Sequence, residues 1–386
     1  MERLTLQIYH NGTWHRAATV AFENPDGGIA SPANVDYELD YVTTWDSDGL
    51  RTEQPAYDVR ALSLNYPTDF ATRYSSGWPP FLLDLLPQGV GRQRIATRLG
   101  FDRPDDRAFD LLLLRHSGGS PIGNLRVEEA WRDEQLRLKG QTFQGLREEE
   151  IHARGDRFAD VVDRYGGLAS GSSGVQGDWP KLLLTQATNG QWYPDPLVRD
   201  EDARAHVIVK LLRSHEPDYA AILAAEAPYL EVARAFGLRV GAGLTPAPGI
   251  LIIPRFDRKV TAQGMVRHGQ ESLVSALGIA QFGYVGHHED YLAILKRVAS
   301  DPRAEVSEYV LRDLLNFAMG NPDNHGRNTA IQKRADGWIG LTPLFDFAPM
   351  RLDPAMIVPS TRWRCLRGGD ADPDWRLLCD AAAEGV

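Results

Sequence analysis

A short polar stretch late in the sequence constrains the fold most. Residues 321–328 are Asn-Pro-Asp-Asn-His-Gly-Arg-Asn; they follow a stretch with helical periodicity and precede the strand-like run 329–332. Asp323 and Asn328 are five residues apart. At this spacing one loop can turn a carboxylate toward an attacking hydroxyl and an amide oxygen inward to a magnesium ion. The stretch therefore predicts a base and a metal ligand in a single loop.

An acid further along the chain extends this pattern. Asp346 stands between two phenylalanines in a mainly apolar run, which suits a second magnesium ligand held rigidly at a strand end. Taken alone, Asp323 and Asn328 are equally well explained as turn and cap residues, because Asn-Pro-Asp-Asn favours turns. Lys210 and Asp346 stand before and after this loop in the order that a kinase requires. This order favours the catalytic interpretation of Asp323 and Asn328 over the turn-and-cap interpretation.

A lysine and a glutamate upstream match the ion pair that orients phosphates. Lys210 lies near the end of the strand-like run 206–211, and Glu226 lies in the helical pattern Ile222–Phe236. Before them, the Gly/Ser-rich stretch 170–177 offers backbone N–H groups to phosphates. The order of loop, strand lysine, helix glutamate, apolar strand, helices, catalytic loop and acid is that of a two-lobed protein kinase. An exposed helix charge is the alternative interpretation of Glu226.

Two further candidates have both a functional and a structural explanation. Lys181 begins the strand-like run Lys181–Thr185 directly after the Gly/Ser-rich stretch. It either contacts the nucleotide or is a solvated lysine at a strand edge that discourages sheet pairing. His325 is either a nucleotide contact or a histidine that completes the hydrogen bonding of its own loop.

The periodicity predicts an α+β chain with more than one core, because single cores stop growing at roughly 250 to 300 residues and this chain has 386. An opening hairpin is expected at 4–22, since alternating apolar residues flank Asn11-Gly12. We expect a mixed α/β subdomain at 1–165, a kinase small-lobe-like part with the Gly/Ser loop and hinge at 166–258, and a mostly helical C-terminal lobe at 259–386. Helical stretches are expected at 81–86, 92–99, 108–114, 146–165 and 271–319.

Charge and cysteine content exclude several classes. The formal net charge of −10 disfavours a broad surface for nucleic acid or anionic lipid, both of which need clustered basic residues. Cys365 and Cys379 are the two cysteines and form no C-x-x-C pair, so a reducing cytosol is the expected compartment. The start of the chain has no apolar signal segment, and no run reaches the ~18 apolar residues of a membrane span. A cytoplasmic protein is expected.

These residues together resemble a known family. The stretch 321–328, the run Pro343–Pro349 and the hinge-like Ile253–Arg258 resemble the HipA-like serine/threonine kinases. Residues 60–64, 81–89 and 118–125 resemble the small N-terminal subdomain of these kinases, so the resemblance covers most of residues 1–350. The resemblance implies an ATP- and Mg²⁺-dependent protein kinase with a two-lobed fold.

The resemblance also implies roles for single residues. Asp323 would be the catalytic base, Asn328 and Asp346 the magnesium ligands, and Lys210 the phosphate-binding lysine. The nucleotide site would include His325, Phe256 and Gln270, with Arg255 and Phe256 near the adenine. Family members are toxins that a small helix-turn-helix antitoxin inhibits, and they contact DNA only through this antitoxin. Some of them phosphorylate aminoacyl-tRNA synthetases.

Three departures from the family pattern stand out. Pro254 occupies a position where the family usually has Glu, which leaves a carbonyl for the adenine amine but removes a side chain and an N–H. The autophosphorylated serine of the family's Gly-rich loop corresponds to Ser170, Ser172 or Ser173, with nothing to choose among them. The chain also ends at Val386, before the full set of helices expected after Asp346.

Two other functions fit part of the pattern. Aminoglycoside- and choline-type phosphotransferases also carry Asp-x-His-x-x-Asn loops, but they lack the subdomain expected in the first third of this chain. A nucleotide-binding or antitoxin-binding module with a decayed active site is the non-enzymatic alternative, and the intact acids Asp323 and Asp346 disfavour it.

Overall fold

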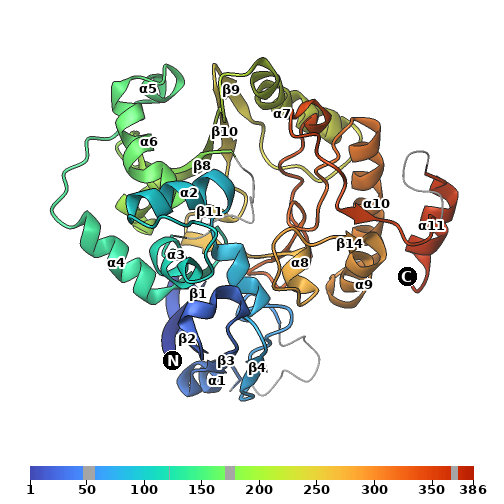
Figure 1. The fold of residues 1–386 in the computed structure, drawn as a ribbon, viewed down its shortest axis with the longest axis horizontal. Helices are drawn as coiled ribbons and strands as arrows, with labels where there is room; N and C mark the ends of the chain where they lie inside the picture. The colour runs from blue at the N-terminus through green and yellow to red at the C-terminus, as the bar shows by residue number, and fades with distance from the viewer. Residues whose placement is uncertain (47–56, 121, 170–178, 367–372) are drawn as a thin grey trace.

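Three sheets organise the chain. The computed structural model describes residues 1–46, 57–120, 122–169, 179–366 and 373–386. Its larger sheets follow one another along the sequence, the first within 2–127, the second within 181–254 and the third within 269–341 (Figure 1). We call residues 1–169 the N-terminal unit, 179–254 the small lobe, and the described residues from 255 onward the large lobe.

The N-terminal unit begins with the hairpin that the sequence predicts. β1 (Glu2–His10) pairs antiparallel with β2 (Thr13–Phe22), and Asn11 and Gly12 between them have φ of 50° and 80°. Positive φ at both turn residues is the reason that Asn-Gly is favoured there. The sheet has the order β4-β3-β2-β1-β5 and is completed by β3 (Ala33–Tyr37), β4 (Arg73–Ser75) and β5 (Leu125–Val127).

Helices pack on this sheet and join it to the small lobe. They are η1 (Pro25–Ala30), α1 (Leu39–Asp46), η2 (Pro80–Leu85), α2 (Gly89–Arg98), α3 (Phe109–Ser117), α4 (Glu128–Leu138), α5 (Glu148–His152) and α6 (Asp156–Ala169). The helix expected at 81–86 is a 3-10 helix. The single helix expected at 146–165 is wrong: it is divided into α5 and α6, because Arg154 has φ 52° and Gly155 follows it.

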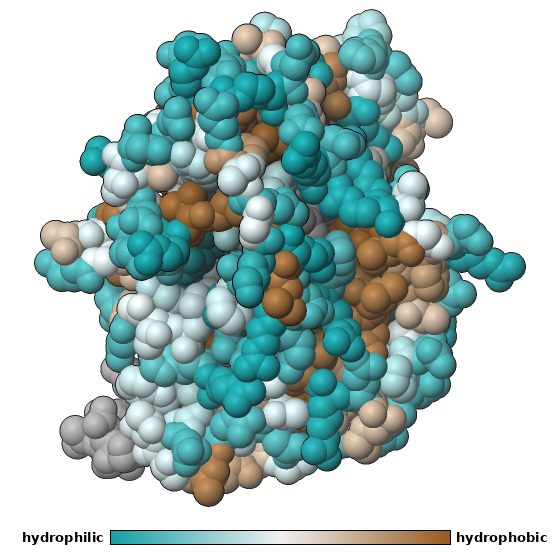
Figure 2. Space-filling view, turned by 90° about the vertical axis from the view of Figure 1, so that its left-hand side faces the viewer, coloured by the Kyte–Doolittle hydropathy of each residue, from teal (hydrophilic) through white to brown (hydrophobic). Residues whose placement is uncertain are grey.

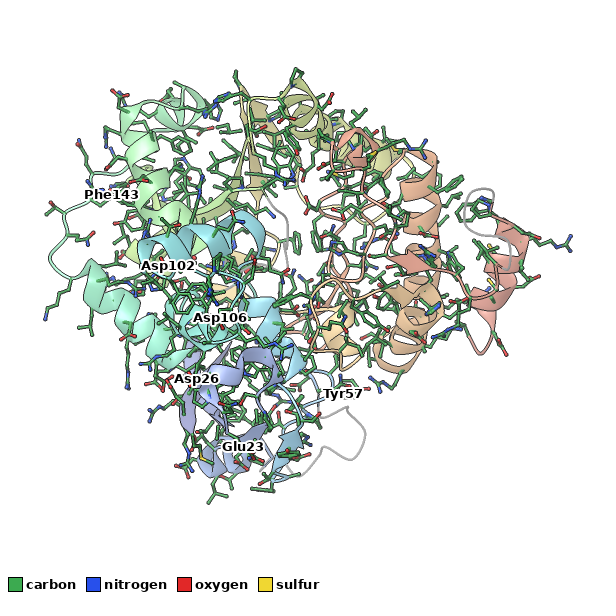
Figure 3. The ribbon with its side chains drawn as sticks, viewed as in Figure 1. Glu23, Asp26, Tyr57, Asp102, Asp106 and Phe143 are labelled. Carbon is green, nitrogen blue, oxygen red and sulfur yellow. The ribbon has the colours of Figure 1, made fainter. Side chains whose placement is uncertain are left out.

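The segment between α4 and α5 crosses to the small lobe. Phe143, labelled in Figure 3, lies in this segment, and its ring contacts the rings of Tyr165 and Tyr193 edge-on, with centroids 6.0 and 5.8 Å away. Figure 2 shows the side of the molecule on which α4, α5 and α6 lie, where apolar residues form several patches separated by hydrophilic ones. Within the described ranges, no helix combines the length and apolar character needed to cross a membrane.

The small lobe is an antiparallel sheet between two helices. Its strands have the order β7-β6-β8-β10-β9 and are β6 (Lys181–Ala187), β7 (Trp192–Pro194), β8 (Ala203–Leu211), β9 (Thr245–Ala247) and β10 (Ile250–Pro254). The short helices η3 (Asp195–Leu197) and η4 (Asp200–Asp202) connect β7 to β8. α6 and α7 (Pro217–Ala235) lie on opposite sides of the sheet (Figure 1). Their apolar side chains pack against it.

The large lobe holds the remaining helices and a small sheet, β13-β15-β16. Its elements are β11 (Arg258–Thr261), β12 (Gly264–Arg267), β13 (Gly269–Ser272), α8 (Leu273–Ala276), β14 (Gly286–His287), α9 (His288–Val298), α10 (Pro302–Ala318), β15 (Ala330–Lys333), β16 (Ile339–Leu341), η5 (Met350–Leu352), β17 (Thr361–Arg362) and α11 (Trp375–Ala383). The helical stretch expected at 271–319 is interrupted after α8, where Gly278 and Gly283 have φ of 83° and 64°. The loop 321–329 lies between α10 and β15.

Candidate active site

The loop between α10 and β15 is held by its own side chains. The Nδ2 of Asn328 donates to the backbone oxygen of Asp323 at 2.9 Å and lies 3.4 Å from its carboxylate. The ring nitrogen Nδ1 of His325 accepts from the backbone N–H groups of Arg327 and Asn328, at 3.3 and 3.2 Å. The structure therefore brings Asp323 and Asn328 together and gives His325 a place inside the loop.

The electrostatic surroundings of this loop set the protonation of two groups. Burial, followed by the negative charge of Asp346, raises the pKa of Asp323 to about 7. Burial lowers the pKa of His325 to about 4, so its ring is neutral near neutral pH, as an acceptor at Nδ1 requires. A carboxyl group with a pKa near the working pH is suited to general-base chemistry.

Lys210 links the two lobes. Its Nζ donates to Glu226 Oε2 on α7 and to Asp346 Oδ1 of the large lobe, both at 2.6 Å. Burial alone would lower the pKa of Lys210, but the charges of Asp346 and Glu226 outweigh it and raise that pKa. Burial would likewise raise the pKa of Asp346, yet the charges of Lys210 and Lys181 lower it. The ion pair expected between Lys210 and Glu226 is present, and Asp346 shares the same ammonium group.

Backbone conformation and strand pairing set the positions of Asp346 and Lys181. Asp346 has φ 54°, in the left-handed region that non-glycine residues rarely occupy and that occurs often at functional sites. Lys181 lies directly opposite Lys210 in the pairing of β6 with β8, and only 1% of its surface is exposed. The interpretation of Lys181 as a solvated edge lysine is therefore wrong.

A cleft lies beside these charges. Its apolar walls include Ile208, Leu230, Ile253, Phe256 and Phe345, and the cleft opens onto the Lys210, Glu226 and Asp346 cluster. An apolar slot with a few charged groups at one end is a common shape for small-molecule sites. Ile122 of the N-terminal unit also lines it, so all three parts of the chain meet at this cleft.

Two buried acceptors at the site have no hydrogen-bond partner within the described part of the chain. They are Asn328 Oδ1 and Gln270 Oε1, and Gln270 lines the cleft. A buried acceptor without a donor is costly, so each atom suits a bound group, a cation in the case of Asn328 and a donor such as an adenine amine in the case of Gln270. The described residues contain no group of three His, Cys, Asp or Glu side chains suited to a metal. A magnesium site does not require such a group of three side chains, since magnesium is commonly held by one or two carboxylates together with phosphates.

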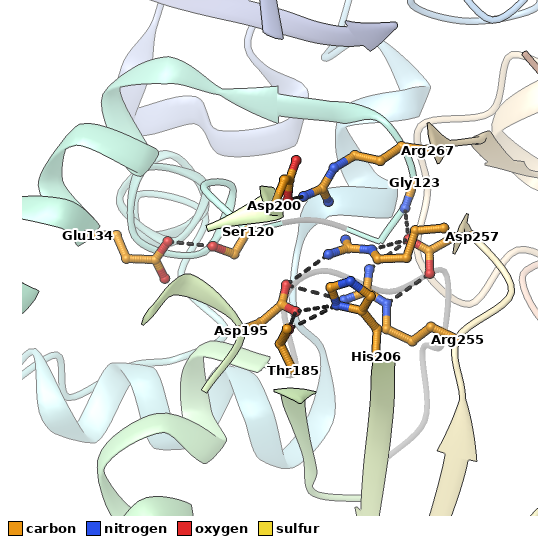
Figure 4. Close-up of polar contacts among 11 residues, drawn as sticks. Ser120, Gly123, Glu134, Thr185, Asp195, Asp200, His206, Arg255, Asp257 and Arg267 are labelled. Carbon is orange, nitrogen blue, oxygen red and sulfur yellow. Dashed lines mark hydrogen bonds and ion pairs between the residues drawn. The ribbon is translucent and has the colours of Figure 1, made fainter. Parts of the chain in front are cut away.

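Arg255 is a buried residue of the hinge. It lines the cleft, but its guanidinium is fully buried and donates to Asp257 at 2.8 and 2.7 Å and to Asp195 at 3.3 Å (Figure 4). Asp195 also contacts Arg258 and His206, and Asp257 accepts from the backbone N–H of Gly123. The guanidinium of Arg255 is thus part of a buried ion network that joins the hinge to the N-terminal unit.

Sequence reasoning missed several residues that shape this site, notably Asp84, Arg327, Asp195 and Asp257. Asp257 lies two residues from Arg255, which is a usable local signal, whereas Asp84 and Asp195 contact residues far away in the sequence. The three serines considered for autophosphorylation, Ser170, Ser172 and Ser173, lie outside the described residues.

The fold and the site together define a class of protein. A β-sheet lobe with a Lys–Glu pair, a lobe with the long helices α9 and α10, the Asp323 loop and Asp346, and a cleft between them make a two-lobed protein-kinase-like fold, as predicted. The HipA-like C-terminal domain model matches residues 172–383, more than half of the chain, and the HipA N-terminal domain model matches residues 38–128. This chain belongs to the HipA-like family.

Two similar proteins add detail. A protein of Sinorhizobium fredii (strain NBRC 101917 / NGR234) named "Putative kinase Y4mE" is 30% identical over 175 residues, which is 42% of this chain and 41% of that protein. The chain thus matches less than half the length of this relative. The solved Shewanella oneidensis MR-1 toxin–antitoxin complex of HipA, HipB and its operator DNA matches with a TM-score of 0.58 and 19% identity, over 90% of this chain and 76% of that one. At this identity the match supports the fold alone.

Proposed function

We propose that this chain is an ATP- and Mg²⁺-dependent serine/threonine protein kinase of HipA type, which transfers the γ-phosphoryl group to a protein hydroxyl and to itself. One observation carries the proposal. Lys210, Glu226 and Asp346 form one ion cluster across the lobes, and the charge of Asp346 acts on Asp323, which is hydrogen-bonded to Asn328. Residues far apart in sequence thus bring carboxylates, an amide and a cation together, and three of them, Lys210, Glu226 and Asp346, line the cleft.

Each residue has a distinct part in this proposal. Asn328 Oδ1 and Asp346 would hold magnesium, which when bound offsets phosphate charge. Asp323 accepts the proton of the attacking hydroxyl, and its pKa of about 7 leaves a substantial ionised fraction at neutral pH. Lys210 orients the phosphates, and Glu226 keeps Lys210 in place. Catalysis is then mostly positioning and charge stabilisation.

The partners follow from the family. The structural relative was solved with the antitoxin HipB and operator DNA, so we propose that a small helix-turn-helix antitoxin binds this chain and supplies any DNA contact. We extend the proposal to a protein substrate, with aminoacyl-tRNA synthetases as the first class to assay. A short neighbouring reading frame that encodes such an antitoxin would support the first part.

The test is a transfer assay with γ-labelled ATP and Mg²⁺, following label on the chain itself and on added proteins. Wild type and Asp102→Asn, a surface control on the N-terminal unit labelled in Figure 3, are expected to label protein equally. Asp323→Asn is expected to label none. Equal labelling by Asp323→Asn would refute the assigned base, and transfer to amino-alcohols but never to protein would favour a small-molecule phosphotransferase.

A further inference from the structure

A buried acid of the N-terminal unit reaches the catalytic loop. Asp84 lies in η2 and is almost fully buried, with 8% of its surface exposed. Its Oδ1 accepts from Arg327 Nη1 and from the hydroxyl of Ser272, both at 2.8 Å, and its Oδ2 accepts from the backbone N–H of Ser272 at 2.9 Å. One carboxylate thus ties the N-terminal unit to two points of the large lobe.

Arg327 connects the Asp84 carboxylate to the loop 321–329. It directly precedes Asn328 in the chain, its own backbone N–H donates to His325 Nδ1, and its Nη2 donates to the backbone oxygen of Gln281 at 3.1 Å. Only 4% of its surface is exposed, so its guanidinium has little access to water and depends on Asp84 for a counter-charge. A shift of this guanidinium would move the backbone that places Asn328 against Asp323.

Ser272 holds the same loop from the other side. Its hydroxyl caps α8, and the next two backbone N–H groups, those of Leu273 and Val274, donate to the carbonyls of Thr329 at 3.0 Å and Gly326 at 3.3 Å. The position of the α8 terminus therefore sets the position of the loop. Asp84 fixes this terminus through Ser272 and the loop itself through Arg327.

We infer that Asp84 is a positioning residue for phosphoryl transfer, through which the N-terminal unit sets the geometry of the catalytic loop. The inference rests on the proposed function. Other ties between the N-terminal unit and the rest of the chain end elsewhere: Ser63 bonds to Glu271 on β13 at 2.6 Å, and Lys333 on β15 donates to the carbonyl of Ala61 at 2.6 Å. Asp84 differs from them because its partner lies inside the loop.

A double-mutant cycle tests this route. Asp84→Asn, Arg327→Gln and the double variant are each expected to lower kcat at least tenfold, with KM for ATP changed less than threefold, because the loop and not the nucleotide cleft is disturbed. If Asp84 acts through Arg327, the double variant is no slower than the worse single variant. Multiplicative losses in the double variant, or an unchanged kcat in either single one, would overturn the inference.

The control is Ser63→Ala, which removes a tie of similar burial that does not touch the loop, and it is expected to keep the wild-type kcat. Should Asp84→Asn not fold, Arg327→Gln carries the test. Burial raises the pKa of Asp84, which favours the neutral form of its carboxyl group when the cation is gone.

Amide hydrogen exchange gives a readout that does not need activity. Backbone amides of residues 325–328 are expected to exchange at least tenfold faster in Asp84→Asn and Arg327→Gln than in wild type, and at the wild-type rate in Ser63→Ala. Wild type without any transfer activity, but with this exchange pattern, would refute the proposed function and leave the structural tie standing. An unchanged exchange rate at 325–328 in both loop variants would refute the tie itself.

Discussion

The substitution Asp257→Asn tests the buried ion network at the hinge. Asp257 Oδ1 accepts from Arg255 Nε, and Oδ2 accepts from Arg255 Nη2, Arg258 Nε and the backbone N–H of Gly123. Asparagine keeps the shape and one acceptor oxygen but loses the charge. Arg255 and Arg258, whose side chains are 0% and 1% exposed, would then lose one of the two described carboxylates that they contact and keep that of Asp195.

The expected loss of stability follows from this burial. Removing one charge from a buried ion pair typically costs about 3 to 5 kcal/mol, because the remaining charge stays desolvated without a partner. We expect the lower end, about 3 kcal/mol, because Asp195 remains. The matched control is Asp200→Asn, which breaks the 2.6 Å pair with Arg267. Since Asp200 is 28% exposed, the expected loss is about 1 kcal/mol or less.

Urea unfolding followed by tryptophan fluorescence measures both variants. Burial would raise the pKa of Asp257, but Arg255 and Arg258 outweigh it and lower that pKa below its ordinary 3.8. The stabilisation is therefore complete above pH 3.8 and is lost as the pH falls through the folded-state pKa, so the gap between wild type and variant should be constant from about pH 6 to 8. Equal losses in Asp257→Asn and Asp200→Asn would refute the account of the network.

Three further results are expected. The kcat/KM of the wild type should fall about tenfold per pH unit below pH 7, because Asp323 must be ionised and its pKa is about 7; a flat profile between pH 5.5 and about 7 would contradict the base assignment. Asp346→Ala should keep its melting temperature within a few degrees, because Lys210 retains Glu226, but should show no autophosphorylation; a wild-type rate would contradict its role. Gln270→Leu should raise KM for ATP about fivefold at constant kcat, as loss of one hydrogen bond predicts; an unchanged KM would place the nucleotide elsewhere.

The sequence predicts which charged and amide groups the fold brings together, because the signals for them are short. Asp323 and Asn328 lie in one loop, and the Asn328 amide contacts both the backbone oxygen and the carboxylate of Asp323. Lys210 and Glu226 are also linked by a local pattern, a strand followed by an amphipathic helix, and their ion pair is present. Patterns within one or two elements are thus enough to find these residues.

The environment of these residues is set by contacts that no local pattern contains. The guanidinium of Arg255 contacts Asp195 and Asp257, and Asp195 lies 60 residues away in sequence. Asp84 lies 243 residues from Arg327 and is surrounded in sequence by leucines, which predict only a buried helix. The breaks at 154–155 and after α8 depend on single residues with positive φ inside otherwise helical periodicity. Such pairings require the folded chain.

Manganese in place of magnesium tests the central claim most directly, because its paramagnetic signal reports binding at the metal ligands themselves. With ATP present, the wild type is expected to bind manganese, whereas Asp346→Asn and Asn328→Leu should lose this binding and Asp102→Asn should retain it. Unchanged manganese binding in both Asp346→Asn and Asn328→Leu would show that these residues do not hold the metal and would contradict the account.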